Sequence, residues 1–287
     1  HRRGDLGVRR RVHRRAADRA NTGGRVGRGA PFIALSGLSA IVWVVGLVRL
    51  PAIRGHLELE RRHPVAEYLE VIREPNHLRG FAFSFFLILG TFTVASFIGP
   101  VLASMNGWSE TQLAVVYFVG GACTLIGTNL VGRLADRLPR LPLFRVMAFG
   151  ALVMAILIGN IQPGPIWVAA LATAAFMTCA AGRMVPAHAM LLGVAKPSVR
   201  GAFMSLNTSV QHLATGLAPT IAGWILVEGP DKKLDGFPLV GLVSASAAAI
   251  SLVLAGFLRM APPPPPIVEV KPLTTAADTE KTPACRA

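Results

Sequence analysis

The residues best suited to bind a ligand lie on one otherwise apolar segment. Asn207, Gln211 and Thr215 are spaced four apart, so on a helix they form one polar stripe, with Thr208 and His212 beside it. Polar side chains are costly inside a membrane and often functional there. Such a stripe could face an aqueous or substrate-filled cavity, or could hydrogen-bond neighbouring helices as structural support. We favour the cavity and predict substrate contacts from Asn207, Thr208, Gln211 and His212.

The other apolar segments carry fewer polar groups. Tyr117 and Thr124 are seven residues apart and share one helix face, and Thr91 lies in an earlier segment. Thr side chains in membranes often bond their own helix carbonyls, which is the alternative for both threonines. We predict that Tyr117, Thr124 and Thr91 line the same site. His212 is an ionisable residue, and we predict that it lies near the middle of a span. We favour a packing role for it over proton transfer.

A second candidate site is the short basic motif GRLADRLPR at residues 132–140. Asp136 lies near a predicted helix end among arginines, where charge-assisted hydrogen bonds could latch two helices in one conformation. A plain positively charged loop is the alternative, but it explains the arginines and not the Gly and Asp at these positions. The predicted gating residues are Gly132, Arg133, Asp136, Arg137 and Arg140.

The sequence offers no catalytic or metal-binding pattern. Its three cysteines show neither a disulfide framework nor metal-ligand spacing. The apolar segments contain no GxSxG, HExxH or GxxxxGK[ST] motif and no pair of carboxylates. We therefore expect no enzyme activity, no metal and no cofactor.

The composition indicates the elements that must position these residues. Of 287 residues, 52% are hydrophobic and only 15% charged, and the mean hydropathy is +0.52. A membrane helix needs about 20 mostly apolar residues. We predict an all-α integral membrane protein, a polytopic helical bundle with about seven transmembrane helices. The predicted spans are 31–50, 80–104, 112–131, 141–160, 166–192, 202–226 and 237–260.

The distribution of positive charge predicts the orientation. If the spans alternate, 17 Lys and Arg collect on one side, Arg183 among them, against Lys232 and Lys233 on the other. The excess places that side and the C-terminus in the cytoplasm of a cell (inner) membrane. The net charge of +14 comes mainly from ten arginines in residues 1–30, so we expect no nucleic-acid partner. This tail falls on the outer side, which its charge disfavours.

The linkers follow from composition. We predict an arginine-rich disordered tail over 1–30 and a transmembrane helix over 31–50. A cytoplasmic linker with an amphipathic helix follows over 51–79, then a six-helix unit over 80–260. Residues 261–287 are a Pro-rich disordered cytoplasmic tail. Because the chain begins with His1 and no signal-peptide core precedes residue 31, we expect a fragment.

The motif at 132–140 resembles the GxLaDrxGr loop signature of the major facilitator superfamily, with Pro139 where the family has Gly. Two other stretches look like its drug and sugar efflux branch: REPNHLRGFAFSFFLILGTF, and GRMVPAHAMLLGVAKPSVRGAFMSLNTSVQHLATGLAPTIAG. On this resemblance 31–50 corresponds to the sixth helix and 80–260 to helices seven to twelve. A sixth helix enters from outside, which accounts for the position of the tail.

The resemblance implies half of a major-facilitator-type transporter, namely the C-terminal half with the sixth helix. Such a protein exports a small organic solute by alternating access, with protons as the antiported ion, in a lipid bilayer and together with a missing N-terminal half. The rival is a non-transporting protein: a truncated remnant or a helical binding partner. Half a cavity alone should not move a solute, so the sequence upstream of His1 discriminates the two.

Overall fold

The computed structural model describes residue 29 and residues 32–49, 64–229 and 234–260. These belong to two compact units, His1–Arg61 and Arg62–Ala287. In the first unit Phe32–Arg49 is a helix long and apolar enough to cross a membrane. The two predicted tails, apart from residue 29, and the first part of the linker lie outside the described residues, as do Lys232 and Lys233.

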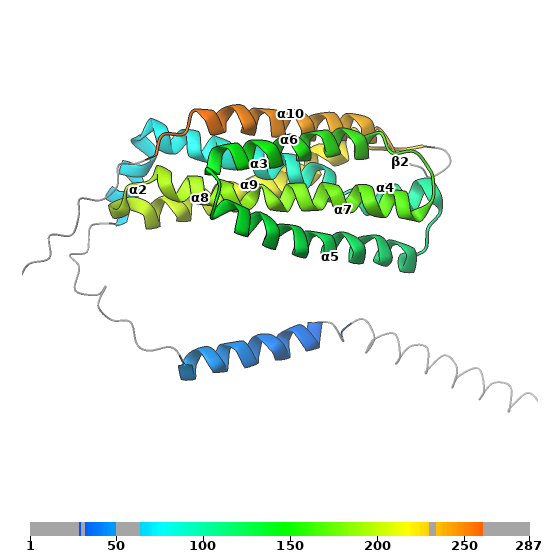
Figure 1. Cartoon of the computed structure of the whole chain (residues 1–287), viewed down its shortest axis with the longest axis horizontal. Coiled ribbons are helices and arrows are strands. Elements are labelled where there is room, and N and C mark those ends of the chain that lie inside the picture. The colour runs from blue at the N-terminus through cyan, green and yellow to red at the C-terminus, as the bar shows by residue number, and fades with distance from the viewer. Residues whose placement is uncertain (1–28, 30–31, 50–63, 230–233, 261–287) are drawn as a thin grey trace, which may run out of the picture. The chain divides into compact units, whose positions relative to one another are not determined.

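The second unit is almost entirely helical (Figure 1). Within the described residues its elements are α2 (Pro64–Arg73), α3 (Pro75–Ala95), α4 (Ile98–Asn106), α5 (Glu110–Ala135), α6 (Arg140–Gly159), α7 (Ile166–Gly182), α8 (Met184–Val194), η2 (Pro197–Val199), α9 (Arg200–Ile225), β1 (Val227–Glu228), β2 (Leu234–Asp235) and α10 (Phe237–Gly256). The two short strands pair antiparallel, with Val227 opposite Asp235.

The helices alternate between two ends of the unit. At one end, which we call the α2 end, the Asn76 side chain donates to the Arg259 carbonyl and accepts from the Arg259 backbone N–H, at 2.7 and 3.0 Å. At the other, the β end, the Leu234 N–H donates to the Ser104 hydroxyl at 3.3 Å. The start of α3 therefore meets the end of α10, and the end of α4 meets the β1–β2 hairpin.

Proline explains why two of the long apolar stretches are each built from two helices. Pro100 and Pro186 both stand at the third position of a following helix, α4 and α8. A proline lacks the N–H for the bond four residues back, and its ring clashes with that carbonyl. The junctions between α3 and α4 and between α7 and α8 fall at those carbonyls. Pro219, by contrast, lies within α9 without interrupting it.

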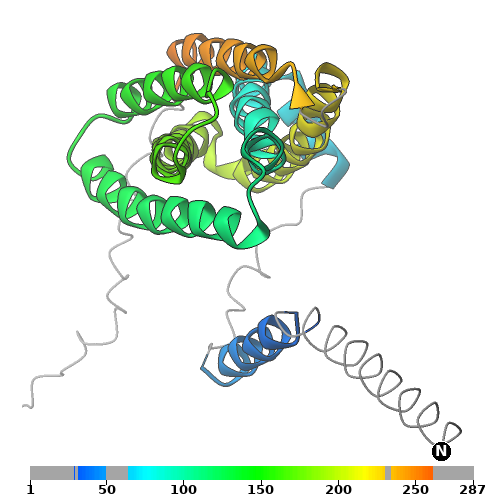
Figure 2. The ribbon, with the colours of Figure 1, turned by 90° about the vertical axis from the view of Figure 1, so that its right-hand side faces the viewer.

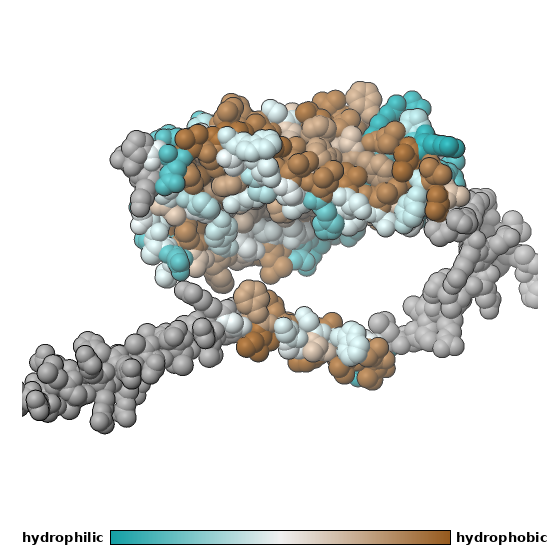
Figure 3. Space-filling model, turned by 180° about the vertical axis from the view of Figure 1, so that it is seen from behind, coloured by the Kyte–Doolittle hydropathy of each residue, from teal (hydrophilic) through white to brown (hydrophobic). Residues whose placement is uncertain are grey.

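Six candidate membrane spans occur among the described residues: Phe32–Arg49, Pro75–Asn106, Glu110–Ala135, Arg140–Gly159, Ile166–Val194 and Phe237–Gly256. The predicted span 202–226 is helix α9, whose 26 residues are long enough to cross but more polar than the others. On the face shown in Figure 3, apolar side chains cover much of the surface, and hydrophilic ones are most frequent toward the ends. The protein is thus a polytopic helical bundle.

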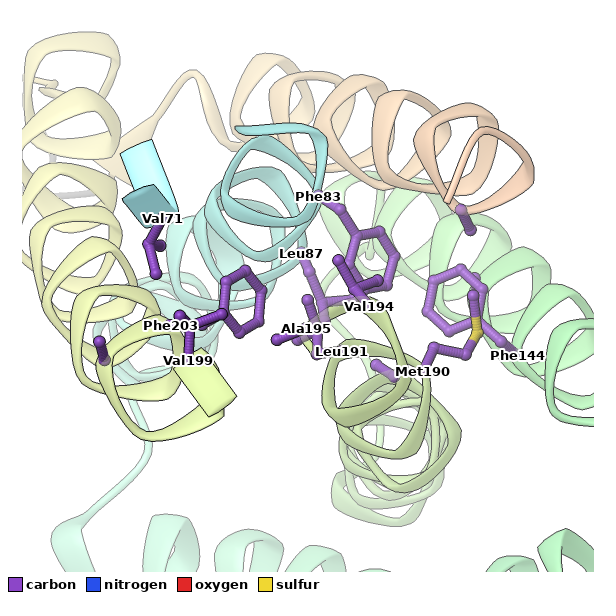
Figure 4. Packing of buried hydrophobic residues seen from close by; sticks show 14 residues of the cluster. Val71, Phe83, Leu87, Phe144, Met190, Leu191, Val194, Ala195, Val199 and Phe203 are labelled. Atoms are coloured by element: carbon purple, nitrogen blue, oxygen red, sulfur yellow. The ribbon is translucent and has the colours of Figure 1, made fainter. Parts of the chain in front are cut away.

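Helices α7 and α8 occupy the interior of the bundle, with α3, α5, α6, α9 and α10 around them (Figure 2). Toward the α2 end, buried apolar side chains from several helices form one core (Figure 4). In it Phe203 projects from α9 toward α3 and α8, and its ring stacks on Phe81 with centroids 5.0 Å apart.

Small residues let α10 approach two neighbours closely. A Cβ atom added to Gly241 would lie 2.9 Å from the Gly159 Cα atom of α6, and one added to Gly90 of α3 would lie 2.9 Å from the Ser244 carbonyl oxygen. The Ser244 hydroxyl also donates to the Gly90 carbonyl. Close backbone contact of this kind is the usual way in which membrane helices associate.

Candidate functional site

The predicted stripe on α9 divides between two surroundings. Asn207 is 1% exposed, and neither of its side-chain amide atoms has a hydrogen-bond partner among the described residues. Gln211 and Thr215 are half-buried, whereas Thr208 and His212 are exposed. The hydroxyls of Thr208 and Thr215 donate to carbonyls one turn back in α9, at 2.9 Å each. The stripe therefore presents its amides inward and His212 outward.

The most unusual polar group is Arg183, at the junction of α7 and α8. Its side chain is 1% exposed, and its Nη2 atom donates to the Thr91 hydroxyl at 2.7 Å and to the Leu87 carbonyl at 3.1 Å. The Thr91 hydroxyl itself donates to Leu87 at 2.9 Å. The Nε and Nη1 atoms of Arg183 are buried without a partner among the described residues. A cation thus sits within the Ile166–Val194 span.

This position corrects the sequence prediction, which counted Arg183 among the cytoplasmic positive charges, although the predicted span 166–192 contains it, and made His212 the ionisable residue at membrane depth. The apolar stretch continues past Arg183 to Val194, eleven residues further along α8. At about 1.5 Å per helical residue, Arg183 lies on the order of 16 Å from the end of α8. The continuation of the apolar pattern beyond Arg183 is the signal that could have identified it as a buried charge.

Contacts between helices give the heights of these groups along the bundle. A Cβ atom on Gly80 of α3 would lie 3.1 Å from Phe203 of α9 and 3.5 Å from Leu191 of α8. These three residues therefore lie at the same height along the bundle. Nearer the β end, Ile88 of α3 clusters with Ala214 of α9. Helices α3 and α9 therefore run parallel, and α8 runs against them.

Counting turns from the Gly80 level places Arg183 and Gln211 about 12 Å, and Thr91 and Thr215 about 17–18 Å, further toward the β end, so the four lie within about one helical turn of one another. We call these four residues the polar layer. The polar layer contains two residues predicted from the sequence, Thr91 and Gln211. It also contains Arg183, which the prediction had counted with the cytoplasmic charges. Asn207 lies one turn closer to the α2 end.

The other two predicted site residues belong to α5. Both are half-buried. A Cβ atom on Gly99 of α4 would lie 2.7 Å from the Tyr117 hydroxyl oxygen, so the tyrosine packs tightly against that helix. The Thr124 hydroxyl is buried and has no partner among the described residues. Tyr117 thus has a packing role between α4 and α5, and Thr124 leaves a polar group unsatisfied.

The predicted gate lies at the α2 end. Asp136 caps the C-terminus of α5, with its backbone N–H bonded to the Gly132 carbonyl at 3.3 Å. In the described residues no ion pair joins Asp136 to Arg133, Arg137 or Arg140, all of which are exposed. Instead, the Arg140 Nη1 atom donates to the Ala189 carbonyl of α8 at 3.2 Å. The connection between α6 and α8 is therefore made by the Arg140 side chain and a backbone carbonyl, and not by Asp136.

Long apolar helices, interrupted spans and buried polar groups at mid-height define a multi-pass membrane transporter of the α-helical class. The chain belongs to the major facilitator superfamily: the family model described as Major Facilitator Superfamily matches residues 24–182, more than half of its length. Among curated proteins no relative matches the sequence. The superfamily is one of transporters and not of enzymes, so a small-molecule substrate and a lipid environment follow from membership.

Proposed function

We propose that the chain is the C-terminal half, with the preceding sixth helix, of a secondary active transporter that exports a small organic solute by proton antiport. The polar layer carries this proposal, because it gathers hydrogen-bonding groups from α3, α7–α8 and α9 at one height inside an otherwise apolar bundle. Carriers that work by alternating access hold their substrate near the bilayer midplane. Asn207, Thr208, His212, Tyr117 and Thr124 extend the proposed site along α9 and α5.

The proposed orientation has the α2 end and the C-terminus in the cytoplasm of an inner membrane. Among the described residues every exposed Lys and Arg of the second unit lies at or near the α2 end: Arg73, Arg79, Arg133, Arg137, Arg140, Arg145, Lys196, Arg200 and Arg259. Positive charge marks the cytoplasmic side of membrane proteins. Residues 132–140 then form the proposed cytoplasmic gate, and the exposed His212 is the proposed proton carrier.

Transport by the protein in vesicles tests the proposal. Because half a cavity alone should not move a solute, vesicles containing the 287-residue chain together with the proposed N-terminal half are given a proton gradient and one of three probes: ethidium, benzoate or glucose. We expect gradient-dependent movement of at least one probe, and its loss on Gln211→Ala. Asn160→Ala is the matched control, because this exposed amide bonds only its own helix, to Ile156 at 2.9 Å.

Failure of all three probes to move would overturn the proposal and favour the rival function, a non-transporting remnant or binding partner. Equal transport by the Gln211→Ala and Asn160→Ala variants would show that transport does not depend on the polar layer. Protein-free vesicles under the same gradient give the passive movement, including that of neutral benzoic acid, and only the excess over it that stops when the gradient is collapsed counts as antiport.

A further inference from the structure

Arg183 is a buried cation that has no counter-charge bonded to it among the described residues. Its bonded partners, the Thr91 hydroxyl and the Leu87 carbonyl, are both neutral. They engage Nη2 alone and leave Nε and Nη1 unpartnered among the described residues. The paired edges of a guanidinium are Nε with Nη2 and Nη1 with Nη2; with Nη2 occupied, the Nε and Nη1 groups each keep N–H donors that can bond an oxygen of an anion.

The described residues offer no acid at this depth. Their acidic side chains lie in α2, at helix ends or in the hairpin: Glu67, Glu70, Glu74, Glu110, Asp136, Glu228 and Asp235. A charged side chain inside a membrane is costly unless it is paired, and such residues usually mark a substrate or ion pathway. An anionic partner for the unpartnered Nε and Nη1 groups of Arg183 would thus have to come from outside the described residues.

We infer that Arg183 binds the anionic group of a carboxylate-bearing solute. Thr91 holds the guanidinium in place through Nη2 while the unpartnered Nε and Nη1 groups remain to donate to the carboxylate. Gln211 and Thr215, at about the same height on α9, are within the same layer and can bond polar groups of the solute. The inference rests on the proposed function and names the class of substrate for that site.

Access follows from the helix junction beside Arg183. The guanidinium is enclosed in this conformation, so a solute reaches it when α7–α8 separates from α3 or α9, a movement of the kind that alternating access requires. Pro186 removes a backbone hydrogen bond at this junction, which weakens the connection between α7 and α8. Arg183, which would bind the anion, therefore lies at the break between α7 and α8.

A binding experiment on the detergent-solubilised 287-residue protein tests the inference without requiring transport. Thermal unfolding is followed with three matched pairs of carboxylate and amide at fixed ionic strength: acetate and acetamide, benzoate and benzamide, 2-naphthoate and 2-naphthamide. Each pair differs in charge at nearly constant shape. We expect at least one carboxylate to bind about tenfold or more tightly than its amide, and Arg183→Gln to remove this preference.

Two further variants keep the test decisive. Arg200→Gln, which removes an exposed arginine at the start of α9, should leave the preference unchanged. If Arg183→Gln aggregates, Thr91→Val retains the cation but removes its hydroxyl partner, and we expect carboxylate binding to weaken roughly three- to tenfold. Equal binding of every acid and its amide, persistence of the preference in Arg183→Gln, or unchanged affinity in Thr91→Val would each overturn the inference.

The outcomes also separate this inference from the proposed function. Arg183-dependent carboxylate binding by a protein that moves no probe in vesicles would support the inference and refute transport. Gradient-driven ethidium export by a protein that does not distinguish carboxylates from amides would support transport and refute the inference.

Discussion

Replacing Gly241 by alanine should drive α6 and α10 apart. The new methyl group would lie 2.8 Å from the Ala155 carbonyl oxygen and 2.9 Å from the Gly159 Cα atom. Carbon atoms in favourable contact are about 3.5–4.0 Å apart, so the helices must separate by roughly 0.6 Å or more. Both contacts are to backbone, which cannot rotate out of the way. Overpacking of this kind costs about 1–3 kcal/mol.

The assay is unfolding in mixed micelles with rising dodecyl sulfate, followed by tryptophan fluorescence. Gly121→Ala in α5 is the matched control, because no atom lies within 4 Å of its added Cβ position. We expect the control to be neutral or stabilised by up to about 1 kcal/mol, since glycine is unfavourable within a helix. If Gly241→Ala proves as stable as Gly121→Ala, the close approach of α6 and α10 is wrong.

Three other predictions concern the ends of the bundle. Asn76→Ala removes both hydrogen bonds to the Arg259 backbone and should lower the free energy of unfolding by about 1–2 kcal/mol. A cysteine at Gln162 should react with an impermeant thiol reagent added outside cells, whereas one at Ser198 should react only after permeabilisation; both positions are exposed. As the single tryptophan, Trp224 should be quenched more by lipids brominated near the headgroup than by lipids brominated near the chain ends.

Each of these has its own control. Asn160→Ala should cost less than Asn76→Ala, because its amide bonds only its own helix. The thiol experiment begins from a variant without native cysteines, since Cys123 is exposed. The reverse labelling pattern would invert the proposed orientation, and stronger quenching of Trp224 by deep bromines would contradict its place at the end of α9.

The membrane class was predictable because lipid leaves few options for a chain. Apolar stretches of about 20 residues become helices whose backbone groups bond internally. A proline also acts locally through its missing N–H: Pro100 and Pro186 coincide with interruptions of the helices, whereas Pro219 does not. The family resemblance based on residues 132–140 agrees with the family match.

The site was harder to predict because partners across helices are not local. From the sequence, Thr91 was predicted to line the site, with a bond to its own helix as the alternative; it makes that bond, but it also accepts from Arg183, 92 residues away. Arg183 was counted with the cytoplasmic positive charges, although the apolar pattern continues eleven residues beyond it to Val194. The expected ion pairs of Asp136 depend on side-chain rotamers, which helical spacing does not determine.

The close contacts of α10 with α3 and α6 have a consequence for motion. Where backbones touch through glycine and serine, no layer of side chains is present that could repack during sliding. Helices α3, α6 and α10 should therefore move as one rigid body. Bending is then confined to the junction of α3 and α4 beside Pro100 and the junction of α7 and α8 beside Pro186. Amide hydrogens around Gly90, Gly159 and Gly241 should accordingly be among the last of the chain to exchange with deuterated water.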